Sequence, residues 1–364
     1  MRQLFTQNPF GTLLRPETAD AIVAGLKGNF HYACEFESGG GAAFFADHLA
    51  ERLGGGELLL FRADLRMITG GEHLVKLLAR SFIQTFAGDL HRIEGVLKKL
   101  IPTATPRLVV GENPHIDINY GTDPHKIFSN LLELPEIMGR KENRRAAVIW
   151  NGFGKIEDVW GAEGPRLFAG TVKGHAITSH IMIGPGMEKT GQKLDGAMPG
   201  RVRPLRGAEL VPREALEACL LQGFAEEGLS MKPETAAAVI RLADGKLETA
   251  QAIARALGRH WDGAPEPAAL DRAVNDMLAD AAAAYEQVWE LLNLRQKGVL
   301  YGLTRGGEKS LYSEWFIKEF GFKTATNLQA AIRALDAKGI LHKRGRQWMF
   351  ADPLFALWIK RRDG

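Results

Sequence analysis

The stretch AAVIWNGF, residues 146–153, constrains the fold of this 364-residue chain more than any other. Its apolar residues are consecutive, which is typical of a strand buried on both faces inside a parallel sheet. Three more strand-like runs, FHYACEF (30–36), ELLLFRADLR (57–66) and HAITSHIMIGPG (175–186), alternate with helical patterns over about the first 200 residues. This alternation predicts an α/β domain in which helices flank a parallel sheet.

The pattern changes after Pro204 to alanine-rich segments whose apolar residues recur every three or four positions. They lie at 212–228, 232–245, 246–261 and 267–292 and predict a helical lid or bundle. Around residue 285 a second series begins, with helices expected over 284–294, 310–321 and 324–339. A strand, a basic turn, a strand and a closing helix follow within 340–362. Three helices and a two-stranded wing make a winged helix-turn-helix domain.

The order of these parts resembles the archaeal-type AAA+/STAND P-loop ATPases, which are relatives of the origin-recognition ATPases. An Asn-Pro-Phe entry at 8–10 contributes to this resemblance, and the ending ADPLFALWIKRR (351–362) is its most specific element, since it is similar to the family's Asp-Pro-Leu-Phe-x-x-Trp. The resemblance covers nearly the whole chain. It implies a P-loop NTPase-like α/β domain over 1–205, a helical lid over 206–284 and a winged-helix domain over 285–364.

A glycine loop stands where this family binds nucleotide phosphates, but its sequence departs from GxxxxGK[ST]. In that motif backbone N–H groups cradle the phosphates, the lysine meets the β and γ oxygens and the hydroxyl binds Mg²⁺. Aligning Gly40 with the second glycine places Glu35 at the first, Gly41 at the lysine and Ala42 at the hydroxyl. The degenerate loop thus comprises Glu35, Ser38, Gly39, Gly40, Gly41 and Ala42.

The second nucleotide motif is degenerate as well. The resemblance implies an Asp-Glu pair at the end of the aliphatic strand, where the carboxylates serve Mg²⁺ and the attacking water, but Asn151 and Gly152 occupy these positions. We therefore expect no ATP hydrolysis, no catalytic residue and no cofactor. Three alternatives remain. The first is an atypical ATPase with a divergent P-loop, and the second is weak ATP or ADP binding without turnover at the N-terminus of the helix after the loop. The third is a plain glycine turn that serves backbone geometry.

Two other segments correspond to places where this family contacts nucleotide. Residues 181–186 fall where the family has a strand whose polar end senses the γ-phosphate. Ser179 and His180 are the polar candidates near it, and we interpret Gly184, Pro185 and Gly186 as a turn. Arg201, Arg203 and Arg206 follow in GRVRPLRG, where the family has an arginine facing nucleotide or a neighbouring subunit. No motif selects one of these arginines, and we interpret the segment as a solvated linker to the lid.

The winged-helix segment carries a local excess of positive charge. Residues 285–364 contain 14 lysines and arginines against eight acidic residues, whereas the whole chain has a formal charge of +3. Such a concentration favours contact with double-stranded DNA. The candidates on the third helix are Asn327, Gln329 and Arg333, for base edges, and those on the basic turn are His342, Lys343, Arg344 and Arg346, for phosphates. The alternative is a protein-interaction module or homo-oligomer contact, because a fold does not fix a function.

Composition excludes several other classes of protein. Cys34 and Cys219 form no CxxC pair, so we expect buried free thiols in a reducing cytoplasm. His115, His125, His175 and His180 lack metal-ligand spacing, and we expect no metal site. No window approaches the length of a membrane span, so we expect no membrane association.

Overall fold

The computed structural model describes residues 13–14, 16–54, 58–86, 91–100, 107–109, 115–117, 123–261, 266–306, 311, 313–320, 322, 324–344 and 347–362. The Asn-Pro-Phe at 8–10 lies outside them. The described residues up to Pro212 form one compact unit and those from Arg213 onward form a second. We call them the α/β unit and the helical unit, and each has its own hydrophobic core.

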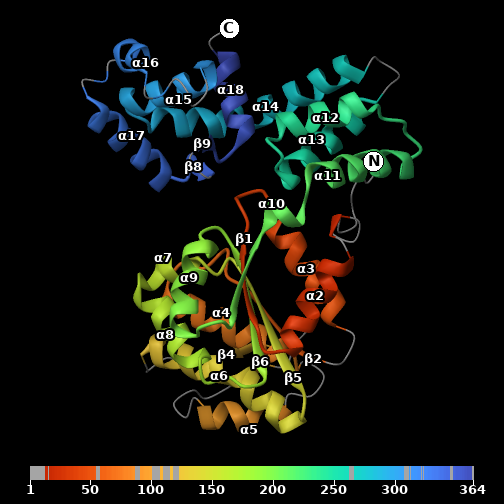
Figure 1. The fold of residues 1–364 in the computed structure, drawn as a ribbon, viewed down its shortest axis with the longest axis vertical. Coiled ribbons are helices and arrows are strands. Elements are labelled where there is room, and N and C mark those ends of the chain that lie inside the picture. Colours follow the sequence, from red (N-terminus) through yellow and green to blue (C-terminus); the bar gives the residue numbers. More distant parts are fainter. Residues whose placement is uncertain are drawn as a thin grey trace. The chain divides into compact units, whose positions relative to one another are not determined.

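Five parallel strands form the sheet of the α/β unit, as the apolar runs predict (Figure 1). They are β1 (His31–Glu35), β2 (Leu58–Asp64), β5 (Arg145–Asn151), β6 (Thr178–Gly184) and β7 (Val202–Arg206), in the spatial order β2-β5-β6-β1-β7. Every residue of β6 is buried, and so is all of β5 after Arg145. The continuous apolar run at 146–153 therefore lies in the interior of the sheet, covered on both faces.

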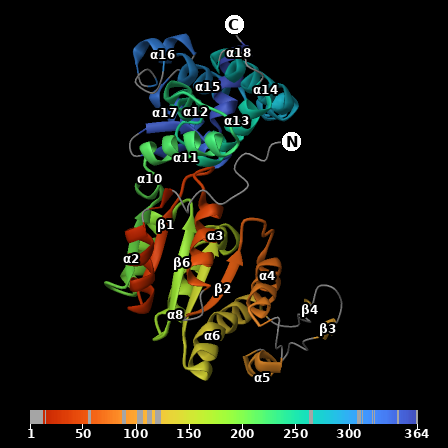
Figure 2. The same ribbon diagram turned by 90° about the vertical axis from the view of Figure 1, so that its right-hand side faces the viewer.

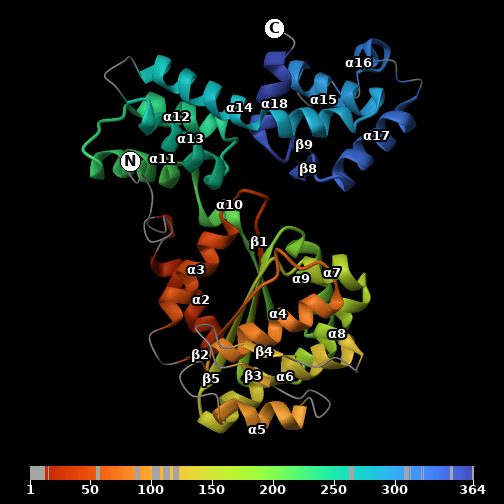
Figure 3. The ribbon, with the colours of Figure 1, turned by 180° about the vertical axis from the view of Figure 1, so that it is seen from behind.

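Helices cover both faces of this sheet. Helices α2 (Pro16–Lys27) and α3 (Ala42–Leu53) lie on one face (Figures 1 and 2). On the other lie α4 (Gly71–Gln84), α6 (Pro124–Glu142), α7 (Lys155–Trp160), α8 (Glu163–Val172) and α9 (Met187–Ala197), which Figure 3 shows from behind. The chain crosses from β1 to β2 in one direction and returns in the other, so right-handed crossovers place α3 opposite the later helices. Helix α5 (His91–Leu100) packs on α6, and α10 (Gly207–Leu210) follows β7.

The segment GRVRPLRG differs from its interpretation as a linker. Residues Val202–Arg206 form β7, an edge strand that pairs with β1 along its whole length. Pro204 lies inside it, and an edge strand tolerates a proline because one side of its backbone needs no partner. The sheet therefore continues to Arg206, and a short antiparallel pair, β3 (Arg107–Val109) and β4 (His115–Asp117), lies outside it.

The helical unit begins with the four predicted helices, α11 (Arg213–Glu226), α12 (Pro233–Leu242), α13 (Leu247–Arg259) and α14 (Glu266–Glu290). The winged-helix part continues with α15 (Leu294–Gly306), α16 (Glu314–Glu319), α17 (Ala325–Ala337), β8 (Leu341–Arg344), β9 (Gln347–Phe350) and α18 (Pro353–Arg362). The proposed boundary between residues 284 and 285 falls inside α14, so the lid and the winged helix share one continuous helix.

Helix α15 is absent from the sequence-based expectation. Its glycines lower helix propensity, and they are also what its packing requires. A Cβ at Gly302 would lie 1.6 Å from the ring of Phe316, and one at Gly298 would lie 3.3 Å from Phe320. The two glycines let α15 approach the aromatic side chains of α16 and its following residue closely enough to form the core of the winged helix.

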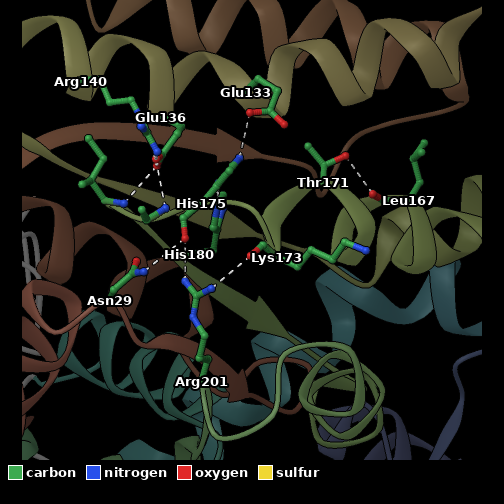
Figure 4. A network of polar contacts seen from close by, with 12 residues as sticks. Asn29, Glu133, Glu136, Arg140, Leu167, Thr171, Lys173, His175, His180 and Arg201 are labelled. Atoms are coloured by element: carbon green, nitrogen blue, oxygen red, sulfur yellow. Dashed lines mark hydrogen bonds and ion pairs between the residues drawn. The ribbon is translucent and has the colours of Figure 1, made fainter.

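His31, His175 and His180 are buried at the amino-terminal end of the sheet, and Figure 4 shows His175 and His180. Trp150 Nε1 donates to His180 Nδ1 at 3.0 Å, and His180 Nε2 lies 3.1 Å from His175 Nδ1. His31 Nδ1 accepts from the backbone N–H of His180 at 3.1 Å. These contacts form a chain of neutral rings inside the sheet, and the expectation that His180 lies near a phosphate-sensing strand end is wrong.

Ser179 is likewise at the start of β6, remote from its carboxyl end at Gly184. Its hydroxyl donates to the carbonyl of Leu26 at 3.0 Å. The neighbouring loop is held by Glu136 on α6, whose carboxylate accepts the N–H groups of Ala176 and Ile177 and pairs with Arg140. Ser179 and His180 thus form hydrogen bonds inside the α/β unit that stabilise its fold.

Candidate functional site

The glycine loop joins the carboxyl end of β1 to α3, where a phosphate-binding loop lies in a parallel α/β sheet. The N–H of Gly40 donates to the carbonyl of Glu37 at 2.9 Å, which closes a tight turn. Gly39 has φ 76° and Gly41 has φ 92°, both in the left-handed region that favours glycine. Ser38 is exposed, Gly41 is buried, and Ala42 is the first residue of α3.

Gly41, which aligns with the lysine of the motif, has a structural role in this loop. Its backbone conformation is one that a residue with a side chain rarely adopts. It also serves as the N-cap of α3 and accepts the first helical hydrogen bond, from the N–H of Phe45 at 2.9 Å. In this loop the position that aligns with the lysine is used for chain geometry.

Glu35 contacts a different helix. Its Oε1 accepts the N–H of Gly186 at 2.9 Å, and its Oε2 accepts the N–H of Glu188 at 2.8 Å. These are N–H groups at the amino-terminal end of α9, which have no partner within that helix and favour a negative charge. The carboxylate at the first glycine position thus bridges the end of β1 to the start of α9.

Asn151 and Gly152 lie at the same edge of the sheet, at the carboxyl end of β5. Asn151 is 7% exposed, and its Oδ1 has no hydrogen-bond partner among the described residues. Gly152 has φ 80°, and a Cβ there would lie 3.0 Å from the side chain of Arg66. The two degenerate motifs follow β1 and β5, which are parallel and have only β6 between them. Both motifs therefore lie at the carboxyl end of the sheet, as the resemblance implies.

The carboxylate nearest to Asn151 in the sheet is already paired. Asp64 ends β2 opposite Asn151, and its Oδ2 lies 2.6 Å from Arg66 Nη2. Burial opposes the shift, but hydrogen bonds from Arg66 and the charges of Arg66 and Arg62 lower the pKa of Asp64. Asp64 is therefore an ionised partner of Arg66.

The three arginines around β7 contact different parts of the α/β unit. Arg201 donates to the carbonyls of His175 and Lys173, at 2.9 and 3.4 Å. The guanidinium of Arg203 lies 3.6 Å from the centre of the Phe30 ring. Arg206 pairs with Glu188 at 3.0 Å, beside the N–H that Glu35 accepts. Of the three, Arg206 is the one beside the degenerate loop.

Helix α17 presents two of its three DNA candidates to solvent. Gln329 and Arg333 are exposed and lie four residues apart, whereas Asn327 is half-buried. The helix is capped by Thr324, whose hydroxyl accepts the N–H of Asn327 at 3.3 Å. Its opposite face, through Leu328 and neighbouring apolar residues, packs in the core. A polar face of this kind suits a groove of DNA.

The wing holds the other candidates. Lys343 and Arg344 are exposed at the end of β8 and His342 is half-buried, whereas Arg346 lies outside the described residues. Lys343 Nζ lies 5.9 Å from the centre of the Trp348 ring on the paired strand β9. Arg344 contacts Asp244, in the turn between α12 and α13, with Nη2 3.2 Å from Oδ2. That partner is 100 residues away, and no sequence pattern indicates it.

The closing motif has a structural explanation. Oδ1 of Asp352 accepts the N–H of Leu354 at 2.8 Å and thereby caps α18, while Oδ2 accepts the hydroxyl of Tyr285 at 2.6 Å. Pro353 is the first residue of the helix, a position where its missing N–H costs nothing. Burial and the Asp352 carboxylate raise the pKa of Tyr285. Asp352 thus ties the last helix to α14.

Cys34 and Cys219 are buried free thiols, as expected, and burial raises the pKa of Cys219 to about 11. Among the described residues no cluster of three or more His, Cys, Asp or Glu side chains is arranged to bind a metal ion. Within the same residues, no helix combines the length and apolar character needed to cross a bilayer.

Comparisons with known proteins agree with this architecture. Residues 283–361 match the model of a probable winged helix domain. Similar solved structures include a Walker-type ATPase of Pyrococcus abyssi, at 15% identity over 96% of each chain, with a TM-score of 0.61. The Aeropyrum pernix ORC1 protein in complex with DNA is 13% identical over 99% of this chain and 96% of its own, with a TM-score of 0.51.

The Aeropyrum pernix ORC2 protein, solved as ADPNP-ADP complexes, is 11% identical over 96% of this chain and 94% of its own, with a TM-score of 0.50. No curated protein matches the sequence. At these identities the likeness establishes the fold. The chain has the AAA+ ATPase fold of the archaeal ORC and Walker-type ATPases, with a C-terminal winged helix, and the predicted fold class is confirmed.

Proposed function

We propose that this chain is a cytoplasmic, non-hydrolysing pseudo-ATPase that acts as a scaffold and binds double-stranded DNA or an assembly partner through its winged helix. The contact of Glu35 with α9 carries the first part of this proposal. A polyphosphate in the glycine loop would lie near this carboxylate, which two backbone N–H groups hold in place. Like charges a few Å apart in a partly desolvated loop oppose binding by on the order of 1 kcal/mol or more.

The residues that would offset this repulsion in an ATPase are absent from the aligned positions. Gly41 and Ala42 offer no ammonium and no hydroxyl, and the amide of Asn151 cannot replace a carboxylate that serves Mg²⁺. The nearest cations described above, Arg66 and Arg206, are paired with Asp64 and Glu188. Weak nucleotide binding at the N-terminus of α3 is the alternative.

Calorimetric titration of the nucleotide-stripped chain with Mg·ATP and with Mg·ADP tests this part. We expect no binding heat up to about millimolar nucleotide and no phosphate release. Phosphate release would contradict the non-hydrolysing proposal, and micromolar binding without phosphate release would favour the alternative of a nucleotide-binding scaffold.

The exposed polar face of α17 and the wing support DNA as the partner. Gln329, Arg333 and Lys343 are exposed on a segment with 14 basic and eight acidic residues. The Aeropyrum pernix ORC1 protein, which shares the fold, has been solved in complex with DNA. A basic surface of this kind binds phosphates with an affinity that falls steeply as salt rises.

Fluorescence anisotropy with a labelled mixed-sequence duplex tests the DNA part. We expect binding by the wild-type chain, and weakening on Arg333→Glu or Lys343→Glu together with a salt slope smaller by about one for each phosphate that the variant no longer neutralises. Lys126→Glu, an exposed position on α6, is the control for net charge. Absence of DNA binding by the wild type would favour the alternative of a protein-interaction subunit.

A further inference from the structure

The turn between α12 and α13 contacts both strands of the wing. Asp244 contacts Arg344 on β8, and Lys246 contacts the end of β9. The turn itself is fixed by backbone hydrogen bonds from Asp244 to Arg241, at 3.1 Å, and from Lys246 to Ala243, at 2.9 Å. The wing is therefore held against a hydrogen-bonded turn of the same unit.

Lys246 anchors the exit of the wing. Its side chain is buried, with only 2% of the residue exposed, and its ammonium donates to the carbonyls of Phe350 and Ala351. A buried ammonium needs such acceptors, so this contact is an integral part of the packing. It fixes the position of β9, and through β9 that of β8 and Arg344.

Arg344 meets Asp244 through both terminal nitrogens. Nη2 lies 3.2 Å from Oδ2, and Nη1 lies 3.4 Å from Oδ1. A guanidinium fork binds a carboxylate and a phosphate with the same geometry. The two nitrogens that would contact a DNA phosphate are thus directed at a carboxylate of the same chain.

We propose that Asp244 competes with DNA phosphates for Arg344. Its ion pair with Arg344 restrains the wing until a DNA phosphate displaces the Asp244 carboxylate. This inference rests on the proposed DNA-binding function and adds a restraint on that site. The side chains of Arg344 and Asp244 are 40% and 30% exposed, so water and ions reach the pair and exchange of partners is inexpensive.

Asp244→Asn is the variant of choice. Asp244 has φ 52°, a conformation that asparagine tolerates well, so the turn is preserved while the charge is removed. Anisotropy with the full chain and the labelled duplex, at about 100 mM salt, should show DNA binding tightened about twofold to fivefold, the range spanned by exposed ion pairs.

Removal of an acidic charge near DNA would also strengthen binding by reducing long-range repulsion. A double-variant comparison separates this effect from the release of Arg344. We expect Asp244→Asn to have no effect when Arg344 is already changed to Gln. An equal gain with and without Arg344, or no gain in the wild-type background, would overturn the inference while leaving DNA binding intact. If neither the wild type nor Asp244→Asn binds the duplex, the proposed DNA function fails, and the inference with it.

Discussion

Acid should destabilise the α/β unit through its three buried histidines. Burial, followed by the charges of Arg201 and His175, lowers the pKa of His31 to about 3. Burial also lowers the pKa of His175 to about 4, although Glu136 opposes the shift, and it lowers the pKa of His180 well below 6.5. For His180 a hydrogen bond acts in the same direction, because Nδ1 accepts from Trp150 and a proton added there would displace the indole N–H.

The sign follows from the direction of the shifts. A histidine whose pKa is lower in the folded state favours that state above the unfolded pKa of about 6.5, and its contribution is lost as pH falls from there toward the folded pKa. At pH 5 the unfolded chain gains about 2 kcal/mol for each histidine that must stay neutral in the fold. Three such histidines amount to roughly 6 kcal/mol between pH 8 and pH 5, and Glu133, whose pKa is raised by burial and by Glu136, partly opposes this loss.

Urea unfolding at pH 8, 6 and 5 measures this loss, with hydrogen exchange of peptides covering β6 to report the α/β unit separately from the helical unit. His175→Gln keeps an acceptor for His180 and should reduce the loss by about 2 kcal/mol. A wild-type loss below about 2 kcal/mol, or an unchanged loss in His175→Gln, would refute the reasoning.

Three further predictions concern the helical unit and are tested by urea unfolding at neutral pH. Gln251→Leu should stabilise the chain by about 1–3 kcal/mol, because Gln251 is 1% exposed and neither amide atom has a partner among the described residues. Asp352→Ala should cost about 2–4 kcal/mol, since it removes the cap of α18 and the acceptor of the Tyr285 hydroxyl; a cost below about 0.5 kcal/mol would contradict both roles. Gly302→Ala should cost about 1–3 kcal/mol or more through its clash with Phe316, whereas Gly170→Ala, with open space around it, is the control.

The strands of the sheet interior could be predicted because burial on both faces leaves a continuous apolar run in the sequence. The edge strand β7 could not, since three of its residues are exposed and one of these is a proline that only an edge position tolerates. Helix α15 was missed for a related reason. Its glycines weaken the local signal, and their role becomes apparent only beside the aromatic rings of another segment.

The sequence likewise predicts one part of the candidate site and misses another. Sequence comparison alone identifies which chemical groups are absent at positions 35, 41, 42, 151 and 152. It does not identify what the remaining groups contact. Glu35 finds its partners 151 and 153 residues away, and Arg344 finds Asp244 at a separation of 100. Such contacts depend on tertiary packing, which no local motif encodes.

The position of β1 in the sheet has a consequence for biosynthesis. β1 is translated first but lies between β6 and β7, and the contact between His31 and His180 spans 149 residues. At a translation rate of about 5–20 residues per second, β1 waits roughly 8–30 s for its first neighbour. During that time a strand of buried residues has both edges open, which is the state that chaperones recognise. The nascent chain should therefore depend on protection from aggregation until the last strand of the sheet has emerged.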